Sequence, residues 1–381
     1  MSRVLIALII LATSFELSCS SHDKSKKNTE QGIKEPIVYA KGFILANFKG
    51  YKKITVFNPW QQAKQVNLEY YLVGRSDSIP AELKGKQIIR TPISKIICLS
   101  TTHIGFLGAL AETSSIQALS GVKYVSNPEV RKRIQNKEIA EIGYEQAINY
   151  ELILSLKPDI VMAYGVDGEV TGTLNKLKEL GIQVILNGEY LEETPLAKAE
   201  WVKFMGAFYN KQELATSYFK TIEQNYKAIC KTVESLKSKP GVLTGLPYKD
   251  TWWVAGGNSN LATLIKDAGG AYLWKENQSR ESFSISLEEV AISASKADYW
   301  INCGTANTIN DLLATDSRFA TFPPVKKRTI FNNNLIVTTE GGNDYWERGV
   351  VRPDLILADL VKIFHPESAN NTIYNFYKPV R

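Results

Sequence analysis

Histidine is scarce in this sequence, and its scarcity restricts the chemistry available to the chain. Only His22, His103 and His365 occur among 381 residues. A site for a bare zinc or manganese ion needs clustered histidines and carboxylates, and a hydrolase needs a base beside its nucleophile. We can assemble neither grouping from these residues. His103 stands at a predicted loop-to-helix junction that could face a cleft, although a locally bonded helix-start residue is the more common role.

The motifs of common enzyme classes are also absent. The sequence has no Gly-x-Gly-x-x-Gly after a strand, no Walker lysine loop and no Gly-x-Ser-x-Gly elbow. Its formal net charge of +6 is small for this length, and its lysines are scattered with no arginine-rich stripe. This distribution argues against a nucleic-acid partner and fits a well-solvated surface. We therefore expect that the chain is not an enzyme.

The N-terminal hydrophobic run is too short to span a bilayer with ordinary flanks. Arg3 precedes this run, and Leu17-Ser18-Cys19 follows it and resembles a lipoprotein processing site. Glu16 departs from that pattern, which usually has an aliphatic residue there. We predict a signal peptide over residues 1–18 and lipidation of Cys19, with a plain signal peptide as the alternative.

The segment after Cys19 is polar and lysine-rich as far as residue 36, which is typical of a tether. It would hold the protein at a membrane through the lipid anchor. The other cysteines, Cys98, Cys230 and Cys303, are dispersed and form neither a disulfide framework nor a metal cluster. We expect them to be buried as small hydrophobic residues.

One short unit occurs twice in the chain. The first copy runs from Asn149 through a helix to Asp159 and an apolar strand, and the second runs from Ser286 through a helix to Asp298 and another strand. Each copy has a capping residue, an acid in the first helical turn and an aspartate between helix and strand. Two such units imply two α/β lobes, and two lobes imply a cleft.

Alternation of strands and helices predicts an α/β fold with mainly parallel sheets covered on both faces. The stretch from Gln212 to Leu236 has no glycine or proline and carries apolar residues at helical spacing, so it predicts one long spine helix between the lobes. Strand-like runs ending at Asn58-Pro59 and Gly74 predict a small antiparallel appendage. We expect the appendage at residues 37–90, the N-terminal lobe at 91–210 and the spine helix at 211–238. The C-terminal lobe is expected at 239–367 and a tail at 368–381.

Aromatic and polar side chains follow several predicted strands. Ligands of open α/β sheets bind beyond the carboxyl ends of the strands, and aromatic walls with a few polar groups suit a large, mostly apolar ligand. A single Tyr or Trp is more often a core residue, and Asp344 and Arg348 have the alternative of an internal pair in a solvated loop. The predicted ligand-binding residues are Tyr124, Tyr164, Trp252, Trp253, Asp344, Trp346 and Arg348.

Together these motifs resemble those of the class III periplasmic solute-binding proteins of ABC importers, which handle vitamin B12, ferric siderophores and haem. The resemblance covers about Thr91 to Pro366 and implies two lobes joined by one long helix, with little closure on binding. The segment at 37–90 has no counterpart in small members of the family. The motifs that carry the resemblance are Asn149-Tyr150-Glu151, Leu156-Lys157-Pro158-Asp159, Gly181-Ile182-Gln183-Val184, Ser286-Leu287-Glu288-Glu289-Val290, Asp344-Tyr345-Trp346-Glu347-Arg348 and Arg352-Pro353.

The resemblance also implies partners. One exposed glutamate on each lobe would meet arginines of the importer permease, which works with its ATPase, and motif position assigns these roles to Glu169 and Glu288. Each glutamate would also stabilise a helix dipole as a first-turn acid. In vitamin B12-binding members, an Asp and an Arg at the positions of Asp344 and Arg348 bond corrin amides, and Tyr124 lies in the matching loop.

The cleft loops hold few arginines and many aromatic residues, which favours a corrinoid over a ferric siderophore or haem as cargo. We expect no intrinsic cofactor, because the cobalt- or iron-containing chelate would be the cargo. The protein would be a lipoprotein of the bacterial cell envelope that faces the periplasm. Two alternatives stay open: an envelope enzyme acting on a corrinoid or other large ligand, and a zinc- or manganese-binding protein of the same broad fold.

Overall fold

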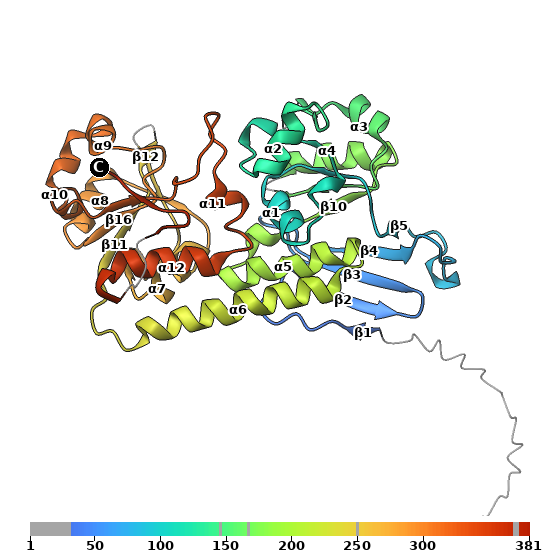
Figure 1. Cartoon of the computed structure of the whole chain (residues 1–381), viewed down its shortest axis with the longest axis horizontal. Helices are drawn as coiled ribbons and strands as arrows, with labels where there is room; N and C mark the ends of the chain where they lie inside the picture. Colours follow the sequence, from blue (N-terminus) through green and yellow to red (C-terminus); the bar gives the residue numbers. More distant parts are fainter. Residues whose placement is uncertain (1–31, 145–146, 166–167, 249–250, 369–372) are drawn as a thin grey trace, which may run out of the picture. The chain divides into compact units, whose positions relative to one another are not determined.

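Four β-sheets organise the chain in this computed structural model, which describes residues 32–381 apart from 145–146, 166–167, 249–250 and 369–372 (Figure 1). The predicted signal peptide and Cys19 lie outside the described residues. Three of the sheets have five strands and one has three. The mainly parallel sheets of two lobes confirm the predicted fold class.

The predicted appendage forms most of a five-stranded sheet in the order β1-β2-β3-β4-β5, and β1 comes from the end of the segment predicted as a tether. It is antiparallel as expected, except that β5 runs parallel to β4. The appendage shares the core of the N-terminal lobe, because Phe43 packs on Trp201 of α5 (Pro195–Phe208) with ring centroids 4.7 Å apart. Its strands are β1 (Ile33–Lys34), β2 (Phe43–Phe48), β3 (Tyr51–Phe57), β4 (Asn67–Gly74) and β5 (Ile88–Thr91).

The sheet of the N-terminal lobe is parallel throughout, in the order β10-β9-β6-β7-β8. Its central strands are buried and apolar, as expected where helices cover both faces. The strands are β6 (Ile96–Cys98), β7 (Ile116–Leu119), β8 (Ala140–Glu141), β9 (Ile160–Ala163) and β10 (Val184–Leu186). The helices of this lobe are α1 (Thr102–Ala109), α2 (Pro128–Gln135), α3 (Tyr150–Leu156) and α4 (Gly168–Glu179), with 3-10 turns η3 (Val122–Tyr124) and η5 (Glu189–Leu191).

The C-terminal lobe has a sheet in the order β14-β11-β16-β17-β18, parallel except for β18, and a small antiparallel sheet in the order β12-β13-β15. The strands are β11 (Gly241–Thr244), β12 (Pro247–Tyr248), β13 (Thr251–Val254), β14 (Ala271–Tyr272), β15 (Phe283–Ile285), β16 (Tyr299–Ile301), β17 (Ile330–Asn332) and β18 (Lys378–Pro379). The helices are α7 (Asn260–Asp267), α8 (Leu287–Ala294), α9 (Ile309–Thr315), α10 (Pro323–Lys327), α11 (Asp344–Glu347) and α12 (Pro353–Phe364).

The predicted spine is helix α6 (Gln212–Glu234), which runs along α5 on the N-terminal side and α12 on the C-terminal side (Figure 1). Its 23 residues extend roughly 34 Å. Ala215, Phe219, Ile222 and Tyr226 recur at helical spacing and form its buried face. One continuous helix therefore braces both lobes.

The two repeated aspartates perform the same structural role. Asp159 accepts hydrogen bonds from the backbone N–H groups of Ser94 and Lys95, at 2.6 and 3.0 Å. Asp298 accepts one from the N–H of Gly241 at 3.0 Å. In each lobe the aspartate that precedes one strand thus holds the chain where it enters the neighbouring strand, β6 or β11. The sequence repeat is therefore a repeat of strand-to-strand anchoring.

Candidate functional site

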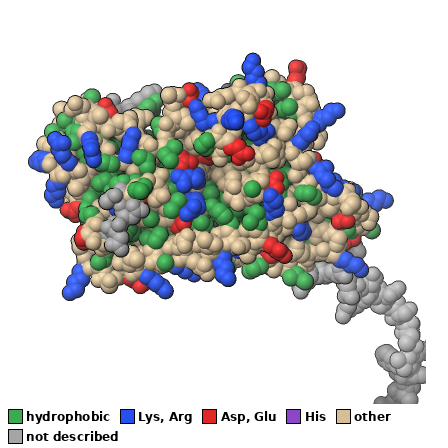
Figure 2. All heavy atoms as spheres, in the orientation of Figure 1, with side chains coloured by type: hydrophobic (Ala, Val, Ile, Leu, Met, Phe, Trp, Pro, Cys, Tyr) green, Lys and Arg blue, Asp and Glu red, His purple; other side chains and the backbone are tan. Residues whose placement is uncertain are grey.

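Three cavities with shared walls lie between the two lobes, and together we call them the cleft. The central cavity measures about 260 Å³, a small cavity beside it about 70 Å³, and a side cavity, which we call the annex, about 180 Å³. The central and small cavities share Lys198, Asn260, Tyr345 and Trp346. Basic, acidic and apolar side chains meet in the region between the lobes (Figure 2).

The cleft lies where parallel strands of both lobes end. Thr102 follows β6, η5 follows β10, and Asn302 follows β16, and all three contribute to its walls. This is the edge at which open α/β sheets bind ligands. The position of the cleft therefore follows from the topology.

Two hydrogen-bond donors of the cleft have no partner among the described residues. Lys198 of α5 is half-buried, and its ammonium group makes no hydrogen bond or ion pair there. Asn260 opens α7, and its buried Nδ2 has no acceptor. Glu189 is buried beside them, and its pKa is raised by burial, although the charge of Lys198 opposes this shift. These donors can bind acceptor oxygens such as carboxylate or amide oxygens.

An aromatic wall faces the same space. Trp346, predicted as a ligand contact, is 59% exposed and lines both the central and small cavities. Tyr345 meets it edge to face, with centroids 4.8 Å apart. Tyr190 completes the wall and donates its hydroxyl to the Gly165 carbonyl. Tyr164 is not among the residues that line the three cavities, but its ring packs against that of Tyr190 at 6.4 Å.

Asp344 and Arg348 form an internal pair. Arg348 Nη2 lies 2.7 Å from Asp344 Oδ2, and Arg348 Nε donates to the same oxygen at 2.7 Å. The guanidinium also lies over the Phe376 ring, 4.5 Å from its centroid. Neither residue lines the three cavities of the cleft. The pairing agrees with the internal-pair alternative, but Asp344 is buried at the start of α11 and does not lie in a solvated loop. That these two residues contact the cargo is not supported by this arrangement.

Glu347, which belongs to the Asp344–Arg348 motif but had no predicted role of its own, connects the two lobes. Its two carboxylate oxygens accept the backbone N–H groups of Ser126 and Asn127, each at 2.8 Å, from the loop that starts α2. The Glu347 side chain is 2% exposed, and burial raises its pKa to about 7, with a further contribution from Asp344. Helix α11 of the C-terminal lobe is therefore bound to the N-terminal lobe through the two hydrogen bonds of Glu347.

Trp252 occupies the core, which corrects its prediction as a ligand contact. It is 0% exposed, stacks on Trp300 at 5.7 Å and donates its indole N–H to the Thr244 carbonyl at 3.0 Å. A side chain so enclosed cannot touch cargo. Trp253 and Tyr124 are exposed, but neither is among the residues that line the cleft.

The two predicted docking glutamates differ in what the structure describes. Glu288 lies in the first turn of α8, is well exposed and pairs with Arg318 at 3.3 Å. The backbone of Glu169 lies in the first turn of α4, but its side chain lies outside the described residues. His103 is buried in α1, and burial lowers its pKa to about 3. It therefore stays neutral and is not among the residues that line the cleft.

Several residues that line the cleft were not predicted from the sequence. Lys198, Asn260 and Arg280 come from α5, α7 and the loop before β15, and only the fold brings them together. Trp60 and Gln61 come from the appendage. Asn58-Pro59-Trp60 gave a turn signal but no indication that the turn reaches the cleft.

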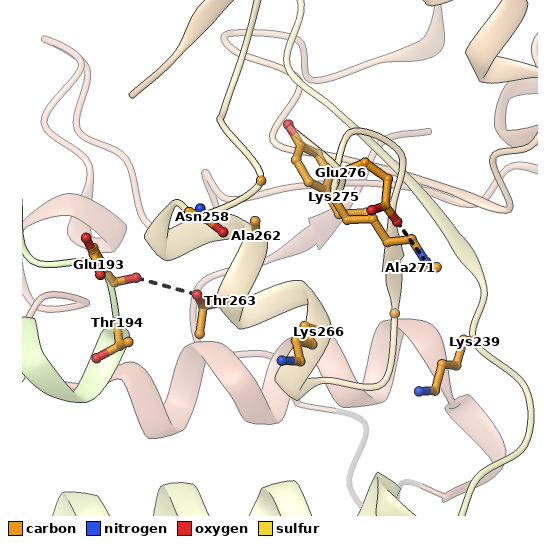
Figure 3. A pocket seen from close by; sticks show the side chains of 13 residues that line it. Glu193, Thr194, Lys239, Asn258, Ala262, Thr263, Lys266, Ala271, Lys275 and Glu276 are labelled. Carbon is orange, nitrogen blue, oxygen red and sulfur yellow. Dashed lines mark hydrogen bonds and ion pairs between the residues drawn. The ribbon is translucent and has the colours of Figure 1, made fainter. Parts of the chain in front are cut away.

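A further cavity of about 520 Å³ lies along α7 and meets the cleft at Glu193 (Figure 3). Three lysines, Lys239, Lys266 and Lys275, contribute to its lining. Lys275 pairs with Glu276 at 4.0 Å, and both side chains are largely exposed. This cavity lacks the aromatic wall of the cleft, so we place the candidate site in the cleft.

The described residues contain no group of three or more His, Cys, Asp or Glu side chains placed to hold a metal ion. They also contain no helix of the length and apolar character needed to cross a membrane. Cys98 and Cys303 are buried and Cys230 is half-buried, and all three are free thiols.

Known proteins resemble this chain in sequence and in fold. An uncharacterized lipoprotein of Methanocaldococcus jannaschii is 26% identical over 388 residues, covering 95% of this chain and 90% of its own. A second uncharacterized lipoprotein of that organism is 26% identical over 332 residues, covering 83% and 81%.

Solved structures share the fold at lower identity. A periplasmic haem-binding protein of Pseudomonas aeruginosa has a TM-score of 0.58 at 16% identity, covering 76% of this chain and 98% of its own. The periplasmic vitamin B12-binding protein of Vibrio cholerae has a TM-score of 0.52 at 15% identity, covering 74% and 99%. The profile of a family described as periplasmic binding protein matches residues 96–333. The chain therefore belongs to the periplasmic binding protein family.

Proposed function

We propose that this protein is the cargo-binding component of an ABC importer and holds a large cobalt- or iron-containing chelate in its cleft. The main support is the combination of the Tyr345–Trp346 wall with two donors, Lys198 and Asn260, whose side chains have no hydrogen-bond acceptor among the described residues. Aromatic walls and a few directed donors suit a large amphipathic ligand. A chelate brings its own metal ligands, so such cargo requires no metal-binding cluster from the protein.

The geometry broadens the proposed cargo. The corrinoid preference relied on Asp344 and Arg348 as free partners for corrin amides, but these residues bond each other. It also relied on a shortage of arginines in the cleft loops, and the cations that line the central cavity are one lysine, Lys198, and one arginine, Arg280. A corrinoid, a haem and a ferric siderophore therefore all remain candidate cargoes, with carboxylate, phosphate or amide oxygens at the edge of the chelate.

For delivery of the cargo, one exposed glutamate on each lobe would bind the permease, which works with its ATPase. Glu288 is exposed at the head of α8 and is free to exchange Arg318 for a permease arginine, because exposed pairs contribute little energy. We assign the matching role to Glu169. Lipidation at Cys19 would tether the protein at the outer face of the membrane, and the two archaeal relatives named as lipoproteins support this assignment.

Absorbance titration of purified protein with cyanocobalamin, haemin and ferrichrome tests the proposal. We expect one-to-one binding of at least one probe and no chemical change of that probe. A Lys198→Gln variant should bind that probe about tenfold more weakly, because one charge-assisted hydrogen bond is lost. A Lys326→Gln variant, at an exposed position of α10 away from the cleft, should match the parent protein. Failure of all three probes to bind would refute the proposed function.

A further inference from the structure

The appended sheet supplies part of the cleft. The connection between β3 and β4 places Gln61 on the central cavity and Trp60 and Ala63 on the annex. This connection precedes the residues 96–333 that the family profile matches. One wall of the annex is therefore built by residues that precede the matched range, and its other walls by residues within that range, among them Leu191 and Arg280.

The wall formed by this loop is held in place. Trp60 forms a parallel bridge with Gly165, and a Cβ added at Gly165 would lie 3.0 Å from Trp60 Cβ. At the loop's ends, the Asn58 N–H donates to the Val66 carbonyl at 2.8 Å and the Val66 N–H donates to Asn58 Oδ1 at 3.1 Å. A fixed surface costs little entropy on binding, which favours recognition.

Among the described residues, the charged groups of the annex leave Arg280 without an ion-pair partner. Glu192 is buried, and its carboxylate accepts the N–H groups of Lys41 and Gly42 and the indole N–H of Trp201. Glu193 pairs with Lys41 at 3.4 Å. Arg280 is exposed, makes no ion pair among the described residues and lines both the annex and the central cavity.

Apart from Asn58, the uncharged side chains that line the annex are apolar, and the largest are Phe57, Trp60 and Leu191. Glu281, next to Arg280, lines the central cavity but is not among the annex residues. We propose that the annex binds an arm of the cargo that joins an apolar surface to an anion, either a carboxylate or a phosphate diester, with Arg280 as the anion's partner. The inference rests on the proposed function, since the cleft must hold the body of the same cargo.

Matched probes with and without such an arm test this site. Cobalamin carries a benzimidazole arm joined through a phosphate diester, and cobinamide lacks that arm. Haemin carries carboxylates, and haemin dimethyl ester lacks them. We expect Arg280→Gln to weaken binding of the anionic member of a bound pair about tenfold, the loss of one charge-assisted contact, and to leave its partner unchanged. Arg280→Lys should retain part of the affinity.

A second variant separates filling of the annex from loss of charge. Ala63→Trp would occupy the annex from a half-buried position and should weaken the armed probe while sparing the unarmed one. Lys326→Gln is the matched control for Arg280→Gln and should change neither. Suppose that both members of a pair bind the parent protein. If Arg280→Gln and Ala63→Trp weaken the binding of both members equally, or weaken neither, the annex proposal is wrong and the proposed function stands. If no probe binds, both proposals fall.

Discussion

Glu347 offers a direct test of how α11 joins the two lobes. Its carboxylate is 2% exposed, yet it carries both contacts to the Ser126 and Asn127 amides. Replacing Glu347 with Gln keeps the shape of the protonated acid and removes the charge that must be buried above neutral pH. The two proteins should therefore differ most at high pH.

The size of this stability difference follows from the linkage between proton binding and folding. The folded-state pKa of about 7 exceeds the ordinary value of 4.5, so the folded chain binds a proton that the unfolded chain releases. Stability from this group is fully present below pH 4.5 and is lost as the pH rises through about 7. Between pH 5 and pH 8 the loss amounts to about 2.5 kcal/mol. The Gln variant cannot titrate there and does not lose this contribution.

Urea denaturation at pH 5 and pH 8, followed by tryptophan fluorescence, measures the effect. The free energy of unfolding of Glu347→Gln, relative to the parent, should rise by about 2.5 kcal/mol from pH 5 to pH 8. Comparison within each pH cancels the titration of all other groups. Glu288→Gln, the same substitution at an exposed glutamate, should show a change below about 0.5 kcal/mol. An equal Glu347→Gln difference at both pH values would refute the buried-carboxylate reasoning.

Three further predictions address docking, anchoring and the core. Replacing both Glu169 and Glu288 with Arg should abolish uptake in a transport assay without changing cargo affinity. The control variant Glu234→Arg, on the spine helix, should change neither uptake nor affinity. Uptake by the double variant would disprove the docking assignment. Cys19→Ala should eliminate fatty-acyl labelling of the full chain, and equal labelling of both proteins would contradict lipidation. Trp252→Phe should lower stability by about 1–2 kcal/mol through the lost indole hydrogen bond to Thr244 and leave cargo affinity unchanged. Weaker cargo binding by a folded Trp252→Phe protein would instead indicate that Trp252 contacts the cargo.

The elements predictable from sequence are those determined by local patterns. The spine helix could be predicted because apolar residues recur at helical spacing with no glycine or proline between them. The observed helix α6 spans Gln212–Glu234. The repeated units were readable because caps and aspartates stand at fixed positions. The parallel pairing of β5 with β4 was not readable, because strand direction depends on how the chain returns across the sheet.

The site was harder to predict because its residues converge from distant elements. Trp252 and Trp253 are neighbours in β13, and alternation places one in the core and the other outside without telling which. The spacing of Asp344 and Arg348 did allow an internal pair on one helical face, and that alternative is what forms. Lys198, Asn260 and Arg280 carry no local signal, since each is ordinary in its own element.

Helix α11 and its C-cap combine three roles within five residues. Asp344 and Arg348 brace the segment from inside, Glu347 attaches it to the opposite lobe, and Trp346 faces the cleft. Breaking the Asp344–Arg348 pair would therefore move the aromatic wall even though neither residue lines the cleft. Loss of cargo binding in an Asp344 or Arg348 variant would consequently not identify either residue as a ligand contact. Variants of Trp346, Lys198, Asn260 or Arg280 do report on contact, because these side chains line the cleft and none of them holds α11 to the opposite lobe.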